Sequence, residues 1–365
     1  MSNLSISQLP SSSGLTGTEV LPIVQSGTTV QTTVQDVANL AGGIIAVGVG
    51  TGSTLRVDNN NTASGDASTV SGGVYNIASG NYSTIAGGVS NTATGSCFAY
   101  STVGGGCGNT ASCNFSTISG GKQNTTSGCL ATVGGGCSNT SSGYASTIGG
   151  GRQNSAVGFS TVGGGCLNTA NGYQSTVGGG QSNTASGCRS TVGGGRLNIS
   201  CNFQSTVGGG YRNISSGCYS TIGGGGFNWA IGCESTVGGG GTNRACNTRS
   251  TISGGKNNTA SGYGSFVGGG QFNTASGCYS IVVGGGSPYG NEGNTASGTQ
   301  SAILGGISNS TNNCNRAMIV GSNITADRAC ATFVNNLSIK NIPTGCAGLP
   351  SGSVWRNGCV LNIVV

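Results

Sequence analysis

A 15-residue segment recurs along most of the chain and constrains the fold more than any other feature. The copy at residues 183–197 reads Asn-Thr-Ala-Ser-Gly-Cys-Arg-Ser-Thr-Val-Gly-Gly-Gly-Arg-Leu, and the copy at 258–272 is closely similar. The Asn that opens each copy recurs every 15 residues, except for steps of 18 after Asn91, 14 after Asn154 and 21 after Asn273. A short fixed period of this kind indicates a solenoid, in which each repeat is one structural unit stacked on the next.

The glycine-rich composition is also typical of collagen and of disordered chains, and the repeat excludes both. Glycine accounts for 75 of the 365 residues but does not recur at every third position, which excludes a collagen triple helix. A polar, glycine-rich chain with only 5% charged residues is also typical of disorder. We reject disorder because Val or Ile returns at one fixed position of the repeat, as at Val70, Ile85 and Val192.

The pattern within one copy predicts which side chains point inward. With the opening Asn as position 1, position 10 is Val or Ile, and position 6 is Cys, Tyr or Phe in most copies, as at Tyr144 and Cys188. Alternate residues of a strand share a face, so we expect positions 6, 8 and 10 to point inward and positions 7 and 9 outward. The small residue at position 3 fits a second inward column. Asn and Gly-Gly-Gly are predicted to mark the two bends, where positive φ is tolerated.

These expectations define an all-β fold: a parallel β-roll, or solenoid, of 15-residue repeats with small β-rich segments at both ends. An interior of Ala, Ser and one Val or Ile per coil is thin. So narrow a roll buries little apolar surface, and the stabilisation from that burial barely offsets the loss of conformational entropy when the chain becomes ordered. Side-by-side or intertwined association would bury more, and we therefore expect a homotrimer.

The chain divides by composition into four segments. Residues 1–45 differ from the repeat, and residues 46–60 are a linker or the first coil. Residues 61–310 form the β-roll shaft, and residues 311–365 form a C-terminal β cap or tip. A cap is expected because the last coil of a solenoid exposes unpaired strand edges.

Both end segments carry signals for strand pairing. Two β-rich runs, 19–25 and 28–34, are separated by Ser-Gly and predict a hairpin, and residues 35–41 predict a short helix. Near the other end, Asn357-Gly358 between two apolar runs predicts a second hairpin.

The N-terminal segment also resembles a known class of protein. The runs Ile-Ser-Gln-Leu-Pro at 6–10, Leu-Thr-Gly-Thr-Glu-Val-Leu-Pro-Ile-Val-Gln at 15–25 and Thr-Thr-Val-Gln-Thr-Thr-Val-Gln-Asp-Val at 28–37 resemble the opening of phage tail-fibre and virion structural proteins. The resemblance implies docking to the particle, and the alternative is a plain cap on the first coil. The candidate docking residues are Leu15, Thr18, Glu19, Pro22 and Val24.

The repeat itself resembles a second family. Ser-Thr-Val-Gly-Gly-Gly with Asn-Thr-Ala-Ser-Gly is similar to the head repeats of trimeric autotransporter adhesins. That resemblance implies a trimeric left-handed β-roll. The chain departs from those adhesins because it shows neither a secretory signal nor a C-terminal membrane anchor, so we expect no export by their route.

Sixteen cysteines raise the question of disulfides or a metal. Cys107, Cys137 and Cys166 recur two coils apart, about 10 Å, beyond the roughly 7 Å Cα separation that a disulfide allows. The cysteines at position 6 are predicted to be small buried hydrophobic residues. The alternative is that they form disulfides between coils or between chains. Only Cys218 and Cys233 occupy position 6 in adjacent coils, where the spacing would allow a bond. Without His and without a Cys-x-x-Cys pair, a zinc site is not expected, and we predict no cofactor.

The inventory of reactive residues argues against an enzyme. There is no His for a catalytic triad, and the seven carboxylates do not recur in one column of neighbouring coils. The 13 basic residues are scattered, so we expect no nucleic-acid binding despite the net charge of +6. No apolar run is long enough to span a bilayer, so no membrane insertion is expected.

These observations predict a structural fibre protein of a phage virion that docks by its N-terminus and attaches to a host surface. Its expected partners are itself, other virion proteins and a host receptor such as a glycan, and its expected location is the exterior of the particle after synthesis in the host cytoplasm. The candidate tip and loop contacts are Tyr289, Glu292, Trp355 and Arg356. The alternatives are a bacterial surface adhesin or matrix fibre and, third, an ice-binding solenoid built on the Thr at position 9.

Overall fold

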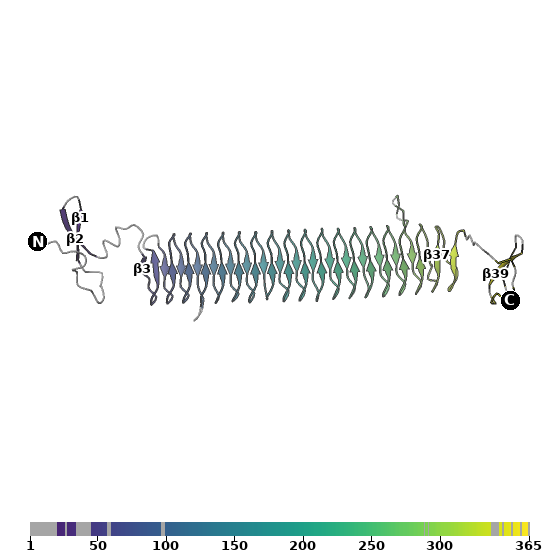
Figure 1. Cartoon of the computed structure of the whole chain (residues 1–365), viewed down its shortest axis with the longest axis horizontal. Coiled ribbons are helices and arrows are strands. Elements are labelled where there is room, and N and C mark those ends of the chain that lie inside the picture. Colours follow the sequence, from purple (N-terminus) through teal and green to yellow (C-terminus); the bar gives the residue numbers. More distant parts are fainter. Residues whose placement is uncertain are drawn as a thin grey trace. The chain divides into compact units, whose positions relative to one another are not determined.

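The computed structural model describes residues 20–25, 28–33, 45–56, 60–95, 99–287, 289–290, 292–336, 343–344, 347–351, 353–357 and 360–363. These residues form strands and no helix: the fold is all-β, a parallel β-solenoid of about 18 turns with repeats of about 15 residues (Figure 1). This confirms the predicted fold class. The chain divides into two units, Met1–Gln204 and Ser205–Val365, which are described separately.

In the first unit, each coil contributes one short strand to each of two parallel sheets. The strands at positions 9 and 10 are β4 (Thr54–Arg56), β6 (Thr69–Val70), β8 (Thr84–Ile85), β10 (Thr102–Val103), β12 (Thr117–Ile118), β14 (Thr132–Val133), β16 (Thr147–Ile148), β18 (Thr161–Val162), β20 (Thr176–Val177) and β22 (Thr191–Val192). Those at positions 2 and 3 are β5 (Thr62–Ala63), β7 (Ile77–Ala78), β9 (Thr92–Ala93), β11 (Thr110–Ala111), β13 (Thr125–Thr126), β15 (Thr140–Ser141), β17 (Ser155–Ala156), β19 (Thr169–Ala170), β21 (Thr184–Ala185) and β23 (Ile199–Ser200). Neighbouring coils pair in register, so that Thr117 lies opposite Thr132 and Ile118 opposite Val133.

The second unit repeats this arrangement. One sheet contains β24 (Thr206–Val207), β26 (Thr221–Ile222), β28 (Thr236–Val237), β30 (Thr251–Ile252), β32 (Phe266–Val267), β34 (Ile281–Val282), β36 (Ala302–Ile303), β37 (Met318–Val320) and β38 (Thr332–Val334). The other contains β25 (Ile214–Ser215), β27 (Trp229–Ala230), β29 (Arg244–Ala245), β31 (Thr259–Ala260), β33 (Thr274–Ala275) and β35 (Thr295–Ala296).

Three antiparallel pairs complete the described strands. The predicted hairpins are both present, as β1 (Val20–Gln25) with β2 (Thr28–Thr33) and as β39 (Val354–Asn357) with β40 (Val360–Ile363). In addition, β3 (Ile45–Val47) runs antiparallel to β4, which itself pairs in parallel with β6. The helix predicted at 35–41 lies outside the described residues.

The Asn at position 1 is buried and links each coil to its neighbours, which corrects its predicted role as a bend residue. Asn139 shows the arrangement: its side-chain Nδ2 donates to the carbonyls of Gly135 and Gly151, both at 2.9 Å. Its backbone N–H donates to Oδ1 of Asn124 at 3.0 Å, and its own Oδ1 accepts the N–H of Asn154 at 3.0 Å. Buried polar groups are costly unless they are paired, and here the amide is paired on both sides.

The rest of the interior comes from positions 3, 8 and 10. Ala185, Ser190 and Val192, from one coil, are all fully buried. Burying a Val or Ile side chain stabilises a fold by about 1.5–3 kcal/mol, and each coil adds one. The predicted inward direction of positions 3, 8 and 10 is therefore correct.

The predicted inward direction of position 6 is wrong. Tyr144 and Tyr173 are 53% and 52% exposed, and Cys233 and Cys278 are exposed as well. Inward-outward alternation holds only along extended chain, and positions 5 to 8 form a turn instead. Position 7 has left-handed backbone there, as at Arg189 (φ 56°), which rotates position 6 away from the interior.

The Gly at position 13 is required by the same ladder. Gly136 has φ 88°, a conformation that L side chains rarely adopt, and a Cβ there would collide with the carbonyl oxygen of Gly151. It would also lie 2.8 Å from Nδ2 of Asn139. The Gly-rich turn therefore brings two carbonyls within reach of each buried Asn.

We expect Asn124→Ala to lower the free energy of unfolding by about 3 kcal/mol or more. The substitution leaves the N–H of Asn139 without its acceptor and the carbonyl of Gly120 without its side-chain donor, whereas the carbonyl of Gly136 keeps the N–H of Lys122. Each buried group left unpaired costs about 1–3 kcal/mol. Urea denaturation followed by circular dichroism measures the change. Gln123→Ala, at the exposed neighbouring position, is the matched control and should stay within about 0.5 kcal/mol; equal effects of the two substitutions would contradict the ladder's importance.

Candidate functional surface

Variable side chains lie at two turns of each coil. The first turn contains positions 6 and 7, and the second contains positions 14 and 15. Positions 7 and 15 are left-handed in most described copies, as at Leu130 (φ 59°) and Leu197 (φ 58°). The sequence pattern did not predict this, because left-handed backbone is usually marked by Gly or Asn and these positions carry many residue types.

Position 14 forms a third column of parallel pairs, which the repeat pattern did not predict either. In the first unit it pairs Val74 with Val89, Cys107 with Lys122, and Lys122 with Cys137. The contacts are single bridges rather than two-residue strands, so no alternating pattern marks them in the sequence. They place the side chains at position 14 in a row along the stack.

One pair of cysteines is bonded within the described residues. Cys113 and Cys129 form a disulfide between adjacent coils, with their Cα atoms 4.8 Å apart. The prediction of buried thiols at position 6 is therefore wrong for Cys129, and the alternative of an inter-coil disulfide is correct there. The repeat pattern does not predict this pair, because Cys113 stands at position 5, where most copies have Gly, whereas Cys129 stands at position 6.

Cys129→Ser should lower the free energy of unfolding by about 2–3 kcal/mol under oxidising conditions. A disulfide that closes a loop of about this length restricts the unfolded chain by roughly that amount. Urea denaturation with and without reductant measures it: the difference between the two conditions should be present in the native sequence and absent in the variant. A native protein insensitive to reductant would contradict the bond.

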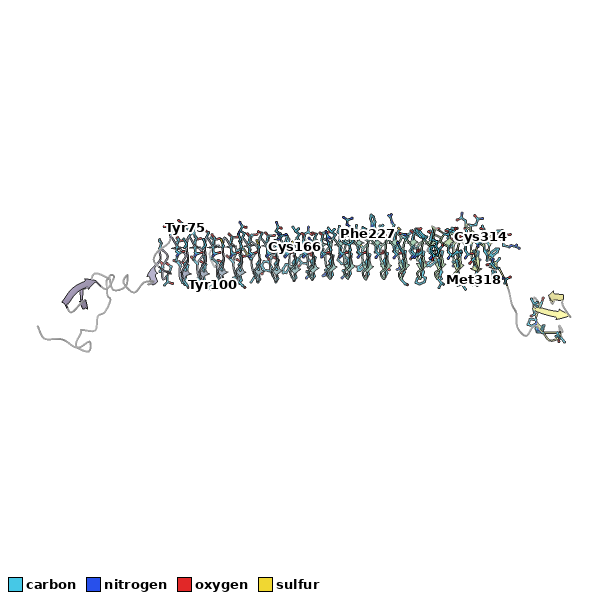
Figure 2. All side chains as sticks on the ribbon, turned by 90° about the horizontal axis from the view of Figure 1, so that it is seen from above. Tyr75, Tyr100, Cys166, Phe227, Cys314 and Met318 are labelled. Carbon is cyan, nitrogen blue, oxygen red and sulfur yellow. A yellow bond between two sulfur atoms is a disulfide. The ribbon has the colours of Figure 1, made fainter. Side chains whose placement is uncertain are left out.

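The first turn of three adjacent coils carries a stack of aromatic rings. Tyr82 and Tyr100 are stacked at 4.7 Å between ring centroids, and Tyr100 and Phe115 at 5.2 Å, with the ring planes 5° apart in both pairs. Their side chains remain 47%, 43% and 50% exposed, and Tyr100 is among the outward side chains of Figure 2. Because the ring faces cover one another, it is mainly the ring edges that meet solvent. The stack is therefore an aromatic ridge with two tyrosine hydroxyls rather than an open platform for a planar ligand.

A charged cluster occupies the first turn of the second unit. Arg249 donates from Nε to Oε2 of Glu234 at 2.8 Å and from Nη1 to the hydroxyl of Tyr263 at 2.9 Å. Both side chains of the ion pair are about half exposed, so the pair contributes little to stability. It connects side chains of three successive coils.

The Asn ladder ends near the last described coils. Ile324 takes the place of the next Asn, and its backbone N–H donates to Oδ1 of Asn309 at 3.0 Å. It has no side-chain amide to extend the ladder. The strands continue nonetheless, since β37 pairs with β36 and β38 with β37.

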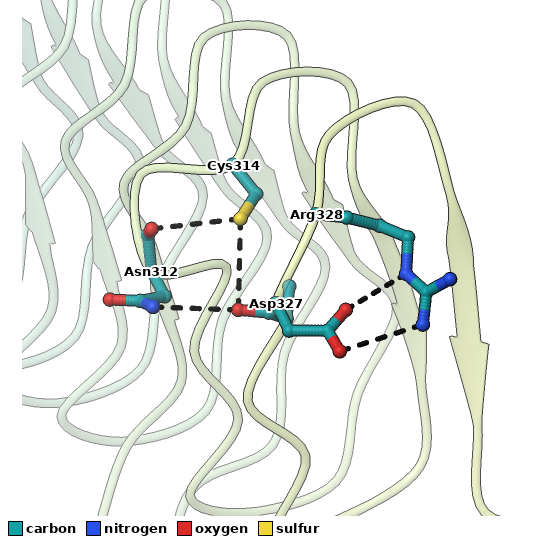
Figure 3. Close-up of polar contacts among 5 residues, drawn as sticks. Asn312, Cys314, Asp327 and Arg328 are labelled. Atoms are coloured by element: carbon teal, nitrogen blue, oxygen red, sulfur yellow. Dashed lines mark hydrogen bonds and ion pairs between the residues drawn. The ribbon is translucent and has the colours of Figure 1, made fainter.

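Polar contacts hold the turns at this end, as Figure 3 shows. Cys314 Sγ lies 3.7 Å from the carbonyl of Asn312 and 3.6 Å from that of Ala326. Beside them, Arg328 Nε donates to Oδ1 of Asp327 at 2.9 Å, and this hydrogen bond holds the pKa of the Asp327 carboxyl below its ordinary value of 3.8.

Arg328→Gln should raise the pKa of Asp327 back toward its ordinary value, because the guanidinium that stabilises the carboxylate is removed. Because the pKa of Asp327 is lower in the folded than in the unfolded protein, its contact with Arg328 stabilises the fold at pH values above the unfolded-state pKa of about 3.8. This stabilisation is lost as the pH falls through the folded-state pKa. A carboxyl-carbon NMR titration of both proteins measures the shift. The pair is exposed, so an unchanged thermal midpoint at neutral pH is expected, and an unchanged Asp327 pKa would contradict the contact.

The predicted loop residues lie on the surface. Tyr289 is 98% exposed and Glu292 is exposed, and the N–H of Ser287 donates to the carbonyl of Glu292 at 2.9 Å. That bond closes the base of the six-residue insertion. Asn294 follows it and keeps its place in the ladder, donating to Oδ1 of Asn273 at 3.0 Å.

The other predicted site residues are described only in part. Leu15, Thr18 and Glu19 lie outside the described residues. Pro22 and Val24 belong to β1, and Trp355 and Arg356 belong to β39; the structure places their backbones in the two hairpins and leaves their side chains undescribed.

Within the described ranges, no group of three or more His, Cys, Asp or Glu side chains is placed to hold a metal ion. In the same part of the chain, no helix is long and apolar enough to cross a membrane. No protein-family model matches the chain, and no curated protein matches it.

Proposed function

We propose that this protein is a structural fibre protein of a phage virion, in which a stack of coils carries surface loops and end segments toward a host. The observation that carries the proposal is the continuity of the Asn ladder through irregular copies. Asn109, Asn168 and Asn294 each donate to the preceding Asn at 2.9–3.0 Å, across steps of 18, 14 and 21 residues. In the longest of these copies Tyr289 is 98% exposed, so the part of the insertion that the structure describes lies outside the interior.

Such a scaffold separates mechanical support from recognition. Backbone and side-chain hydrogen bonds along the stack make each unit resistant to bending between coils, as in other repeat architectures. The outer positions tolerate Arg, Gln, Tyr, Leu and Glu without change of register. Recognition by loops carried on a rigid scaffold is common in binding proteins.

The proposed assembly is a homotrimer that docks through residues 1–45. Support comes from the β1–β2 hairpin in a segment outside the repeat and from its resemblance to virion proteins. Exposed apolar residues on the coils, such as Tyr219, Leu167 and Phe227, offer surface for association between copies. Sedimentation equilibrium of the purified chain tests the trimer, and a monomer at micromolar concentration would contradict it.

Deleting residues 1–45 should give a folded protein that no longer incorporates into particles. Deletion of 258–272 is the matched control, because it removes one whole repeat and lets Asn273 take the place of Asn258 in the ladder. Incorporation is measured by immunoblot of purified particles. Normal incorporation of the first variant would overturn the docking role, and finding the native protein on uninfected cells would favour the adhesin alternative.

Deleting residues 288–293 tests host attachment. The deletion removes Tyr289 and Glu292, restores a 15-residue step to Asn294, and leaves the ladder intact. We expect particles that assemble normally and adsorb to host cells at least tenfold less. Unchanged adsorption would show that this loop is not the contact.

A further inference from the structure

In the first unit, Cys residues alternate with Lys and Arg at position 14 of five successive coils. Position 14 pairs Cys107 with Lys122, Lys122 with Cys137, Cys137 with Arg152, and Arg152 with Cys166 as parallel bridges. Paired strands lie about 4.8 Å apart, so each of these side chains starts about that far from the next. Cys137 is the one thiol in the row with a cation on both sides; Cys107 follows Val89, and Cys166 precedes Gln181.

The backbone holds this row in place. The N–H of Cys137 donates to the carbonyl of Gly151 at 2.8 Å, and its carbonyl accepts the N–H of Gln153 at 2.9 Å. The N–H of Ser138 donates in turn to the carbonyl of Lys122 at 2.8 Å. Lys122 and Arg152 are exposed and Cys137 is half-buried, so a ligand from solvent can reach the thiol and both cations together.

One cationic side chain of the row, that of Arg152, contacts a thiol directly. Arg152 Nη2 lies 3.6 Å from Sγ of Cys166 in a hydrogen bond. That bond is the largest cause of a raised pKa of the Arg152 guanidinium, and Cys137 adds a smaller Coulombic contribution. Arg152 therefore contacts Cys166 directly and is paired with Cys137 on its other side in the row.

We propose that Cys137 is a modification site for small disulfides that carry carboxylates, of which oxidised glutathione is the biological example. The Cys137 thiolate attacks one sulfur of the disulfide and forms a mixed disulfide. The sulfur–sulfur bond of the reagent breaks, its other half leaves as a thiolate, and that thiolate takes up a proton equivalent to the one lost by Cys137. The reagent is the oxidant, and no further reactant is needed.

Charge complementarity gives the site its selectivity. Lys122 and Arg152 attract the carboxylates of the incoming reagent and pair with them in the product. Two cations, each about 6 Å from the charge of the reagent in water, should raise the reaction rate of an anionic reagent roughly tenfold over that of a neutral one. They should lower the rate of a cationic reagent by a similar factor. Cys107 and Cys166, with one cation each, should show a weaker preference than Cys137.

The test uses the reduced full-length protein and three small dialkyl disulfides: dithiodipropionate (anionic), hydroxyethyl disulfide (neutral) and cystamine (cationic). Site-resolved mass spectrometry measures the rate at each cysteine. Rates are divided by that of Cys278, an exposed thiol with no charged residue in its own turn or in the two adjacent turns, which contain Tyr263 and Thr299. The nearest cations, Arg249 and Arg316, bond to Tyr263 and Gln300 of those adjacent turns, so any attraction of anions to Cys278 lowers the normalised rate at Cys137 rather than raising it. We expect the normalised rate at Cys137 to be at least tenfold higher with the anionic than with the cationic reagent, and this ratio to fall toward one in 1 M salt.

The double variant Lys122→Gln/Arg152→Gln should remove the preference and leave the circular dichroism spectrum unchanged. Gln is compatible with the fold at these positions because Gln181 occupies the same column. Oxidised glutathione should then modify the native protein faster than the variant at Cys137, by roughly tenfold. A normalised rate independent of reagent charge, or a preference that survives in the double variant, would overturn the proposal.

Discussion

The buried Asn ladder is the interaction on which the rest of this structure depends. Each amide donates to two glycine carbonyls and accepts a backbone N–H from the next coil, so one side chain joins three turns of chain. A two-residue strand has too few backbone pairs to fix a coil by itself, and the apolar contribution of one Val or Ile per coil is modest. Repetition makes the sum large, because every coil adds the same contacts to the one before it.

This division of roles explains where the sequence is free to vary. Positions 1, 3, 8, 10 and 13 are tied to the interior or to the ladder, whereas positions 6, 7, 14 and 15 face solvent at the turns. The free positions form rows, because equal registers bring equal positions side by side. Aromatic stacking at Tyr82, Tyr100 and Phe115 and the alternation of thiols with cations are both consequences of that arrangement.

Much of the fold could be predicted from periodicity, and the failures have specific causes. The recurrence of Val or Ile at position 10 predicted the inner column, and turn residues between β-rich runs predicted both hairpins. Position 6 was misplaced because strand alternation was extended into a turn, where left-handed backbone at residues such as Arg189 reverses the expected direction. The Asn was interpreted as a bend residue, although its recurrence without replacement by Gly, Asp or Ser was a signal for a side-chain role. The disulfide was missed because Cys113 and Cys129 lie in different columns.

Hydrogen exchange of the side-chain amides tests the ladder most directly. Exposed Asn side-chain NH₂ groups exchange rapidly with solvent, whereas amide protons that are buried and doubly bonded exchange only when the structure opens. NMR of the labelled protein in deuterated buffer should therefore show strongly protected Nδ2 protons at the ladder positions, such as Asn124, Asn139 and Asn258, and rapid exchange at the exposed Asn323. Exchange at the ladder positions as fast as at Asn323 would contradict the account.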